Sequence, residues 1–287
     1  MTDEIILADL HSHTTASDGL LTPSELIERA ISHGVQMFAI TDHDTTAGLA
    51  EAHAHNNGHE TPLVLINGVE ISSRWHNHDI HIVALNIDLN DTTFDDFLIH
   101  QRDLRERRAK EIGVRLAKAG IEGAYQGAKS MAGDAALSRG HYARWLADKG
   151  YATSMANVFK KYLAQGKTGY VPNNWSELAT VIEVIHQAGG LAVLAHPSGY
   201  KLSTKWVKRL VREFKEAGGD AMEVVLSQQT VEARNFLISL SLQHELSASL
   251  GSDFHFPGSW TELGKSMYQP PGVNWVWQTD NWPVANV

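Results

Sequence analysis

The stretch I-I-L-A-D-L-H-S-H, residues 5–13, is an apolar run of strand length that ends in two histidines. The same order of features returns in Q-M-F-A-I-T-D-H-D, residues 36–44. Short apolar runs of this kind predict buried strands, and side chains at the ends of parallel strands converge on one mouth of a barrel. The two stretches therefore predict a barrel-like sheet with ionisable residues at its mouth.

Seven apolar runs are long enough to be strands, and helical patterns separate most of them. The runs are Ile5–Leu10, Gln36–Thr41, Leu63–Val69, Ile80–Asn86, Leu191–Ala195, Ala221–Leu226 and Ser247–Gly251. Alternating strands and helices predict a largely parallel α/β sheet, and seven strands fit a distorted barrel smaller than the usual eightfold one. Between the third and fourth runs there is no room for a helix, so the alternation fails there.

The clearest helix is predicted over Pro23–His33. Thr22 is a good N-cap, Pro23 suits the first helical position, Glu25 completes a capping box, and Gly34 supplies the stop. Other helices are predicted at Thr46–His55, Ser176–Ala188, Thr204–Ala217 and Thr230–His244.

The segment 92–170 interrupts the alternation and is interpreted as a helical insertion between two parts of the barrel, residues 1–91 and 171–287. It holds one long predicted helix, Thr92–Ala119, then a Gly- and Ala-rich stretch, then shorter helices near His141–Lys149 and Ser154–Ala164. The C-terminal tail is rich in tryptophan, and we expect it to pack across the barrel rather than stack on a substrate base. Its tryptophans are Trp260, Trp275, Trp277 and Trp282.

Composition narrows the function classes. The 287 residues are 43% hydrophobic and 20% charged, which is typical of a soluble globular protein. The chain lacks a run of about 18 apolar residues. Its N-terminus carries acids where a signal peptide would carry Lys or Arg, so we expect a cytoplasmic protein without a membrane span. The absence of cysteine excludes thiolate metal sites and cysteine nucleophiles. A net charge of −9 argues against a generally basic nucleic-acid-binding surface.

Six histidines and three acids stand where they could surround metal ions and carry catalysis. They are His11, His13, Asp18, His43, Glu70, His81, His196, Asp253 and His255. Each has a structural alternative: a pair of histidines two residues apart occurs by chance in a chain with 16 of them, and Glu70 or His81 alone could be a satisfied structural group. Together they favour a metal cluster, because burying so many ionisable groups unpaired would be costly.

This set of nitrogen and oxygen ligands suits Mn²⁺, Fe²⁺ or Zn²⁺, with Mg²⁺ less natural beside so many imidazoles. Nine ligands exceed what one ion needs, so we expect two or three divalent ions with Glu70 as the bridging carboxylate. Clustered ions lower the pKa of a bridging water and bind the oxygens of a phosphate during in-line displacement. The expected reaction is hydrolysis of a phosphate ester without a covalent enzyme intermediate.

The fragments H-S-H, T-D-H-D, G-V-E, A-H-P and G-S-D-F-H, with Asp18 and His81, resemble the successive motifs of the PHP (polymerase and histidinol phosphatase) family. The resemblance implies a distorted seven-stranded β/α barrel that holds three divalent ions, for which Mn²⁺ is our expectation. It implies one ion on His11, His13, Glu70 and Asp253, a second on Glu70, His81 and His196, and a third on Asp18, His43 and His255.

A narrower resemblance is carried by L-S-R-G-H-Y-A-R, V-F-K-K-Y-L-A-Q-G-K-T-G-Y-V-P and G-D-A-M-E-V, at residues 137–144, 158–172 and 219–224. These stretches are similar to bacterial 3′,5′-nucleoside bisphosphate phosphatases, and within them to the RNase AM branch of 5′→3′ exoribonucleases. The resemblance implies removal of the 3′-phosphate from pAp-like bisphosphates and stepwise cleavage of RNA. The partner is then a nucleotide or short RNA with a 5′-phosphate. No obligate protein partner is indicated.

Basic residues that could read this phosphate gather in the insertion. Residues 101–120 carry seven Lys/Arg against three acids, a local charge of +4. Arg102, Arg105 and Arg108 share a face of the predicted helix, whereas Arg107 and Lys110 fall on another and are expected to be exposed.

Arg139 precedes an expected helix start at Gly140–His141, where free backbone N–H groups would favour an anion. An arginine can bind a phosphate with two parallel hydrogen bonds. The alternative for these cations is a solvated basic helix face. The predicted substrate-binding residues are Asp18, Arg105, Arg108, Arg139, His141 and His255.

Two other functions are compatible with the metal motifs. The first is a phosphatase for a small metabolite such as histidinol phosphate, and the second is a non-catalytic metal-binding module. A small monophosphate needs no second phosphate site, so the arginine-bearing insertion favours the nucleotide phosphoesterase. The full ligand set argues against a non-catalytic module.

Overall fold

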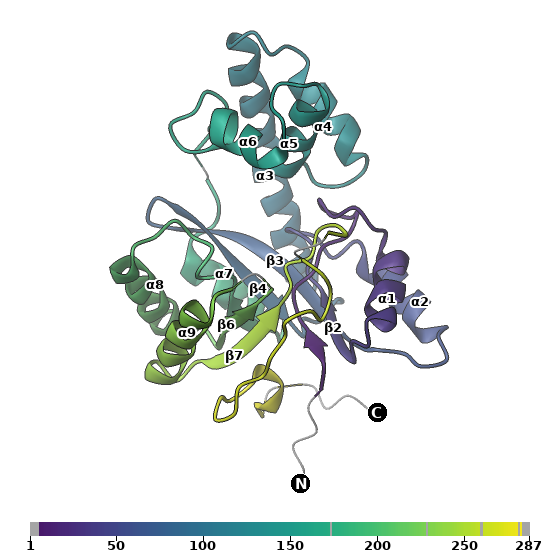
Figure 1. Ribbon diagram of the computed structural model, residues 1–287, viewed down its shortest axis with the longest axis vertical. Coiled ribbons are helices and arrows are strands. Elements are labelled where there is room, and N and C mark those ends of the chain that lie inside the picture. The colour runs from purple at the N-terminus through teal and green to yellow at the C-terminus, as the bar shows by residue number, and fades with distance from the viewer. Residues whose placement is uncertain (1–5, 173, 228, 259–260, 281, 283–287) are drawn as a thin grey trace.

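The computed structural model describes residues 6–172, 174–227, 229–258, 261–280 and 282. Figure 1 shows a strand barrel with helices around it and a group of helices that stands beyond one end of the barrel. None of the helices in these ranges is long and apolar enough to cross a membrane.

The seven strands lie side by side in chain order. They are β1 (Ala8–Asp9), β2 (Met37–Ile40), β3 (Val64–Trp75), β4 (His78–Leu85), β5 (Leu191–Leu194), β6 (Ala221–Leu226) and β7 (Ser247–Gly251). The backbone N–H of Leu10 donates to the carbonyl of Leu250 at 3.2 Å, which joins the edge of β7 to that of β1. The predicted distorted seven-stranded barrel is confirmed. β1 is shorter than predicted, and Ile5 lies outside the described residues.

One strand runs against the others. β3 and β4 form an antiparallel hairpin, β4 pairs antiparallel with β5, and the other four neighbouring pairs are parallel. The sheet is largely parallel, as predicted, and the regular alternation fails at β4, where the short connection leaves space for a turn but not for a crossover helix. Because β4 is reversed, its first residues, rather than its last, lie at the mouth of the barrel. His81 therefore reaches that mouth although it does not end a strand.

In the described part of the chain, five α-helices besides the long α3 cover the barrel. They are α1 (Pro23–Ser32), α2 (Leu49–Asn57), α7 (Leu178–Gln187), α8 (Thr204–Glu216) and α9 (Val231–Gln243). The predicted capping box of α1 is present: Thr22 Oγ1 accepts from the N–H of Glu25, and the Glu25 carboxylate accepts from the N–H of Thr22. Gly34 follows with a positive φ of 74°, as expected for a helix stop.

The C-terminal tail packs as predicted. Trp275 and Trp282 are buried in the main hydrophobic core of the barrel, and Trp277 stacks on Trp275 with ring centroids 5.0 Å apart. Trp260 lies outside the described residues.

The long helix α3 (Thr92–Lys118) joins two hydrophobic cores. Phe94 and Leu98 in its first part are buried in the barrel core, whereas Ile112 and Leu116 belong to a second core beyond the barrel. That second core is completed by α4 (Ala124–Ala132), α5 (Arg139–Asp148), α6 (Met155–Val158) and a π-helical turn (Phe159–Leu163).

Helix α4 lies in the Gly- and Ala-rich stretch where no helix was predicted. Its small residues let α5 approach closely: a Cβ built on Gly127 would lie 2.0 Å from Nε1 of Trp145. Ala124, Ala128 and Ala132 are buried in the second core. Tertiary packing thus outweighs the low helix propensity of glycine.

Gly251 tests how closely the barrel is packed where β7 meets the segment after β1. A Cβ at this position would lie 2.3 Å from Cβ of His11 and 2.9 Å from its backbone nitrogen. We expect Gly251→Ala to lower the free energy of unfolding by roughly 1–3 kcal/mol, measured by urea denaturation. Gly58→Ala is the control, because Gly58 has a φ of −83° and its Cβ would meet nothing nearer than 3.4 Å. Equal stability of the two variants would contradict the close packing.

Candidate metal centre and substrate cavity

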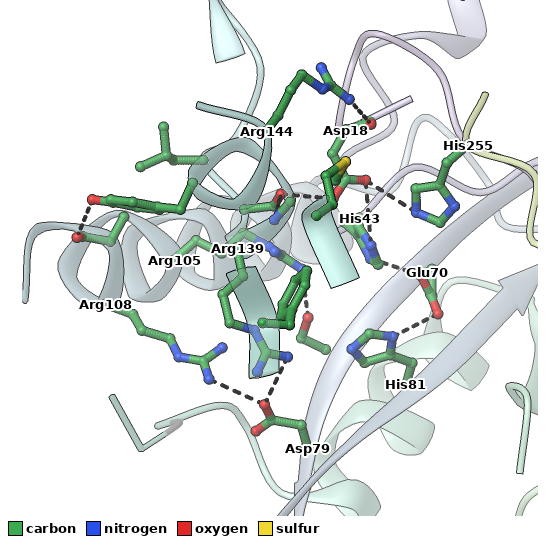
Figure 2. Close-up of a pocket in the computed structure, with 18 of the residues that line it drawn as sticks. Asp18, His43, Glu70, Asp79, His81, Arg105, Arg108, Arg139, Arg144 and His255 are labelled. Carbon is green, nitrogen blue, oxygen red and sulfur yellow. Dashed lines mark hydrogen bonds and ion pairs between the residues drawn. The ribbon is translucent and has the colours of Figure 1, made fainter. Parts of the chain in front are cut away.

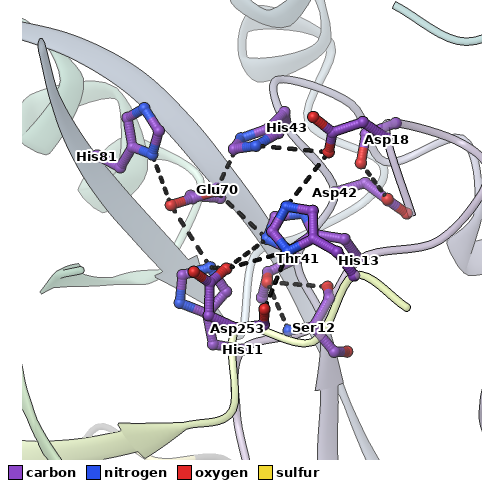
Figure 3. Close-up of polar contacts among 12 residues, drawn as sticks. His11, Ser12, His13, Asp18, Thr41, Asp42, His43, Glu70, His81 and Asp253 are labelled. Atoms are coloured by element: carbon purple, nitrogen blue, oxygen red, sulfur yellow. Dashed lines mark hydrogen bonds and ion pairs between the residues drawn. The ribbon is translucent and has the colours of Figure 1, made fainter. Parts of the chain in front are cut away.

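The nine residues predicted to surround metal ions meet at the mouth of the barrel, and Figure 3 shows the part of the cluster around Glu70. Three groups have ligand atoms that all lie within 4.8 Å of one another: His13, Asp18, His43 and His255; His11, His13 and Glu70; and His43, Glu70 and His81. His196 joins through Glu70 at 2.9 Å, and Asp253 through His13 at 3.2 Å. The grouping differs from the expected one in that His13 and His43 each lie between two groups.

Glu70, in the middle of β3, is at the centre of the cluster and is only 1% exposed. Five imidazoles surround its carboxylate. Oε1 lies 2.7 Å from His81 Nδ1, 2.9 Å from His196 Nε2 and 3.4 Å from His11 Nε2. Oε2 lies 2.7 Å from His43 Nδ1 and 3.4 Å from His13 Nε2. Both oxygens face nitrogen ligands on different sides, which is the arrangement that a bridging carboxylate needs.

Several ligand atoms are buried without a hydrogen-bond partner among the described residues. They are His11 Nε2, His13 Nδ1, Asp18 Oδ1, His43 Nδ1 and Glu70 Oε2. Asp18 Oδ1 lies 3.6 Å from His43 Nε2 and 3.4 Å from His255 Nε2. Ligand atoms at about 2.1 Å from one ion lie about 3.0–3.4 Å apart. Asp18 Oδ1, His43 Nδ1 and Glu70 Oε2 have ion-pair neighbours but no hydrogen bond of good geometry in the described residues, and their spacing therefore fits divalent metal ions.

The electrostatics of the cluster also call for cations. Burial opposes ionisation of Glu70, but the histidines around it, His81 foremost, hold the pKa of its carboxyl well below the usual range. Burial and the charge of His255 lower the pKa of His13 to about 3. Burial opposes the charged form of His255, but the Asp253 and Asp18 carboxylates together raise its pKa to about 10. Positive charge must balance the buried carboxylates, and a neutral His13 is the form that binds a metal.

Glu223, which the sequence analysis missed as a site residue, orients two of the candidate ligands. Its Oε1 lies 2.6 Å from His11 Nδ1, and its Oε2 accepts a hydrogen bond from the backbone N–H of His196 at 2.5 Å. A carboxylate in this position fixes the ring and the tautomer of a metal-binding histidine. The available signal was one acid inside the apolar strand A-M-E-V-V-L, residues 221–226.

Asp42 holds the loop that carries Asp18. It accepts hydrogen bonds from the backbone N–H of Thr14 at 2.8 Å, from Thr14 Oγ1 at 2.6 Å and from Ser17 Oγ at 2.5 Å. Asp42 is 1% exposed. In T-D-H-D, therefore, the first aspartate supports the loop and the histidine faces the cluster.

The insertion reaches the metal centre through Asp18. Ser138 Oγ donates to Asp18 Oδ2 at 2.7 Å, and Arg144 Nη2 donates to the Asp18 carbonyl at 3.1 Å. Ser138 also caps α5 by accepting from the N–H groups of Gly140 and His141, so these amides are not free as the sequence analysis expected. The His141 ring accepts from the Ser138 N–H, and burial lowers its pKa to about 4. His141 thus serves the cap of α5.

Positive φ angles occur at three residues of the site, as they do elsewhere at His76, Asn86, Glu245 and Ser266. Asp44, His196 and Asp253 have positive φ angles of 51°, 30° and 53°. Residues with a Cβ avoid this region, and such outliers gather where a site requires one orientation of a side chain. The strain at His196 and Asp253 belongs to two candidate metal ligands.

An open cavity of about 350 Å³ extends from the metal centre to the insertion. One wall carries Asp18, His43, Glu70, His81, His196, Asp253 and His255. The opposite wall carries four arginines, which Figure 2 shows around the same space: Arg105, Arg108, Arg139 and Arg144. The three arginines predicted to bind a phosphate therefore face the same cavity as the metal centre.

Arg108 and Arg139 share one carboxylate. Their Nη2 atoms lie 3.2 Å and 3.4 Å from Asp79 Oδ2. Burial lowers the pKa of Arg108 to about 10, which leaves its guanidinium charged at neutral pH. One carboxylate between two guanidinium groups leaves an excess positive charge that suits a phosphate.

Arg105 is engaged to a similar degree as Arg108, whose Nε and Nη2 also donate to the Val171 carbonyl at 3.2 Å. The Nε of Arg105 donates to Asp44 Oδ2 at 2.6 Å and its Nη2 to Ser72 Oγ at 2.7 Å, and Arg105 is 8% exposed. Arg107 and Lys110 are exposed, as predicted.

The comparisons agree with this geometry. The model of the family described as "PHP domain" matches residues 9–188. The 5′-3′ exoribonuclease Rnm of Salmonella typhimurium is 53% identical over 97% of this chain and 95% of its own length. A 3′,5′-nucleoside bisphosphate phosphatase of Chromobacterium violaceum is 39% identical over 94% of this chain and 95% of its own. The solved structure of an amidohydrolase from Chromobacterium violaceum, with bound sulfate and no metal, has a TM-score of 0.88 at 39% identity, with 94% of each chain covered.

Glu223 can be tested without removing a ligand. Glu223→Gln keeps the size of the side chain but removes the charge that orients His11, so we expect the affinity for divalent metal to fall 10- to 100-fold. Titration of metal-free protein with Mn²⁺ against a competing chelator measures this change. Glu232→Gln, an exposed glutamate of α9, is the matched control. Unchanged affinity in Glu223→Gln would show that this carboxylate does not orient a ligand.

Proposed function

Because the chain belongs to the PHP domain family, we propose that it is a metal-dependent phosphoesterase for nucleotides with a 5′-phosphate. It removes the 3′-phosphate of 3′,5′-nucleoside bisphosphates and cleaves short 5′-phosphorylated RNA from the 5′ end. The observation that carries this proposal is that one cavity joins the ligand cluster to a wall of arginines. The activities named for the similar proteins support it.

The nine clustered residues would hold up to three divalent ions, for which the nitrogen and oxygen donor set favours Mn²⁺ over Mg²⁺. Such ions supply an activated water and neutralise charge on the phosphate oxygens. Glu70 would bridge ions with its two oxygens, as its five imidazole neighbours suggest. Asp18, His43 and His255, which group with His13, lie at the side of the cavity that faces the insertion.

The residues of the chain perform the positioning. Arg108 and Arg139 bind the 5′-phosphate, and the excess charge around Asp79 draws it away from the metal centre. Ser138 holds the Asp18 carboxylate in one orientation through its hydrogen bond to Oδ2. The cavity is therefore preorganised for a substrate with two phosphate groups, one at each wall.

The arginine wall and the metal wall of the cavity also explain why cleavage would proceed from the 5′ end of the RNA. A phosphate fixed at the arginines leaves the 3′-phosphoester of the same nucleotide at the metal centre. The cavity, about 350 Å³, is in the range of a site for one small ligand. Cleavage then releases one nucleotide from the 5′ end in each cycle. A 3′,5′-bisphosphate satisfies the same two sites without an RNA chain.

A Mn²⁺-supplemented assay with four substrates tests the proposal. We expect hydrolysis of pAp and of a 5′-phosphorylated oligoribonucleotide, and little hydrolysis of the 5′-hydroxyl oligoribonucleotide or histidinol phosphate. His196→Ala removes a ligand of the cluster and should abolish turnover, while circular dichroism shows a retained fold. Elemental analysis should find up to three transition-metal ions per chain. Preference for histidinol phosphate would assign the site to small metabolites.

Arg108→Ala and Arg139→Ala test the phosphate site. A charge-assisted hydrogen bond contributes on the order of 1.5–3 kcal/mol, so kcat/KM for pAp should fall roughly 10- to 100-fold in each variant. Hydrolysis of p-nitrophenyl phosphate, which lacks the second phosphate, should change little. Arg107→Ala, which removes an exposed arginine from the same helix as Arg108, is the control. Equal losses on both substrates would place these arginines in the metal centre or the fold.

A further inference from the structure

A second concentration of positive charge lies on the outside of the barrel, on α8 and the residues just before it. Residues 201–216 carry six Lys/Arg and two acids, a local charge of +4 in a chain of −9. Arg209 and Arg212 form ion pairs with glutamates of the same helix. Lys201, Lys205 and Lys208 are exposed, and none has an ion-pair partner in the part of the chain that the structure describes.

An exposed indole, Trp206, follows Lys205 in the sequence, and the Arg209 guanidinium lies 5.1 Å from its ring centroid. Trp206 is 37% exposed, and its ring centroid lies 5.6 Å from that of Trp75, 5.9 Å from that of His76 and 5.8 Å from that of His78. These partners belong to the tip of the β3–β4 hairpin, which lies beside α8 (Figure 1). We call Lys201, Lys205, Trp206, Lys208, His76 and His78 the outer basic surface.

Residues adjacent in sequence connect the outer basic surface to the mouth of the barrel. Along β4, Asp79 and His81 face the cavity, whereas His78 points to the other face of the hairpin and contacts Trp206. Tyr200, the residue before Lys201, accepts a hydrogen bond from the His81 N–H at 2.8 Å. A chain that leaves the cavity over the hairpin or past Tyr200 therefore meets the surface directly.

We propose that the outer basic surface binds the part of an RNA substrate that lies 3′ of the nucleotide in the cavity. This proposal rests on the proposed function, because an exonuclease that holds one nucleotide in its cavity leaves the rest of the RNA outside. Unpaired lysines attract the phosphates and release counterions, which gives a salt-dependent affinity. An exposed indole stacks on a base of any identity. A 3′,5′-bisphosphate has no further chain and gains nothing from the surface.

The variants Lys205→Ala/Lys208→Ala and Trp206→Ala test the proposal. With a 5′-phosphorylated oligoribonucleotide of about ten nucleotides, we expect each to raise KM roughly tenfold. Fluorescence anisotropy in EDTA measures RNA binding apart from turnover. The slope of log affinity against log salt should decrease by about 0.7 for each lysine removed. The kinetic constants for pAp should not change, and Trp206→Phe should restore most of the RNA affinity.

The control is Lys118→Ala/Lys129→Ala, which removes two exposed lysines of the insertion. An unchanged affinity for RNA in the α8 variants, or an equal loss in the control, would overturn the proposal. A loss on pAp as great as that on RNA would also overturn it, since the residues would then serve the fold or the cavity. If the wild-type protein cleaves pAp but not RNA, the exonuclease part of the proposed function is wrong. The anisotropy measurement then still decides whether the outer basic surface binds RNA.

Discussion

The structure depends on keeping one buried carboxylate ionised. Glu70 is almost fully shielded from water, and its charge is tolerable only because five imidazoles, and the cations they can hold, surround it. Those imidazoles come from the segments after β1 and β2, from β4 and from the end of β5. The barrel thus brings distant parts of the sequence to one point, and Glu223 and Asp42 fix the approach of its ligands.

Local patterns predicted most of the fold because local interactions determine it. β6 and β7 have the predicted bounds, and α1 starts at Pro23 behind the predicted capping box. Two features were beyond these patterns. The helix α4 depends on Gly127 packing against Trp145, a contact between helices that propensity does not contain. The reversal of β4 was visible only as a connection too short for a helix.

The candidate ligands were predicted as a set because they are the right residue types beside strand-like runs, and the structure places them together. The residues that orient these ligands were not predicted, since their role depends on which segments face each other in space. Ser138 meets Asp18 across 120 positions of sequence, and as the cap of α5 it also occupies amides that were expected to be free for an anion. Asp79 gains its role only where Arg108 and Arg139 converge.

The reversed strand β4 explains the length of α3. A strand that runs away from the mouth delivers the chain to the opposite end of the barrel. The next helix, α3, therefore runs back along the sheet toward the mouth before it reaches the insertion. Its 27 residues span about 40 Å. Arg105 and Arg108 are therefore set at the height of the metal centre by residue count along an uninterrupted rod. Deletion of one residue of α3 before Arg105 would turn both guanidinium groups by about 100° away from the cavity. The number of residues in α3 therefore determines whether these arginines face the cavity.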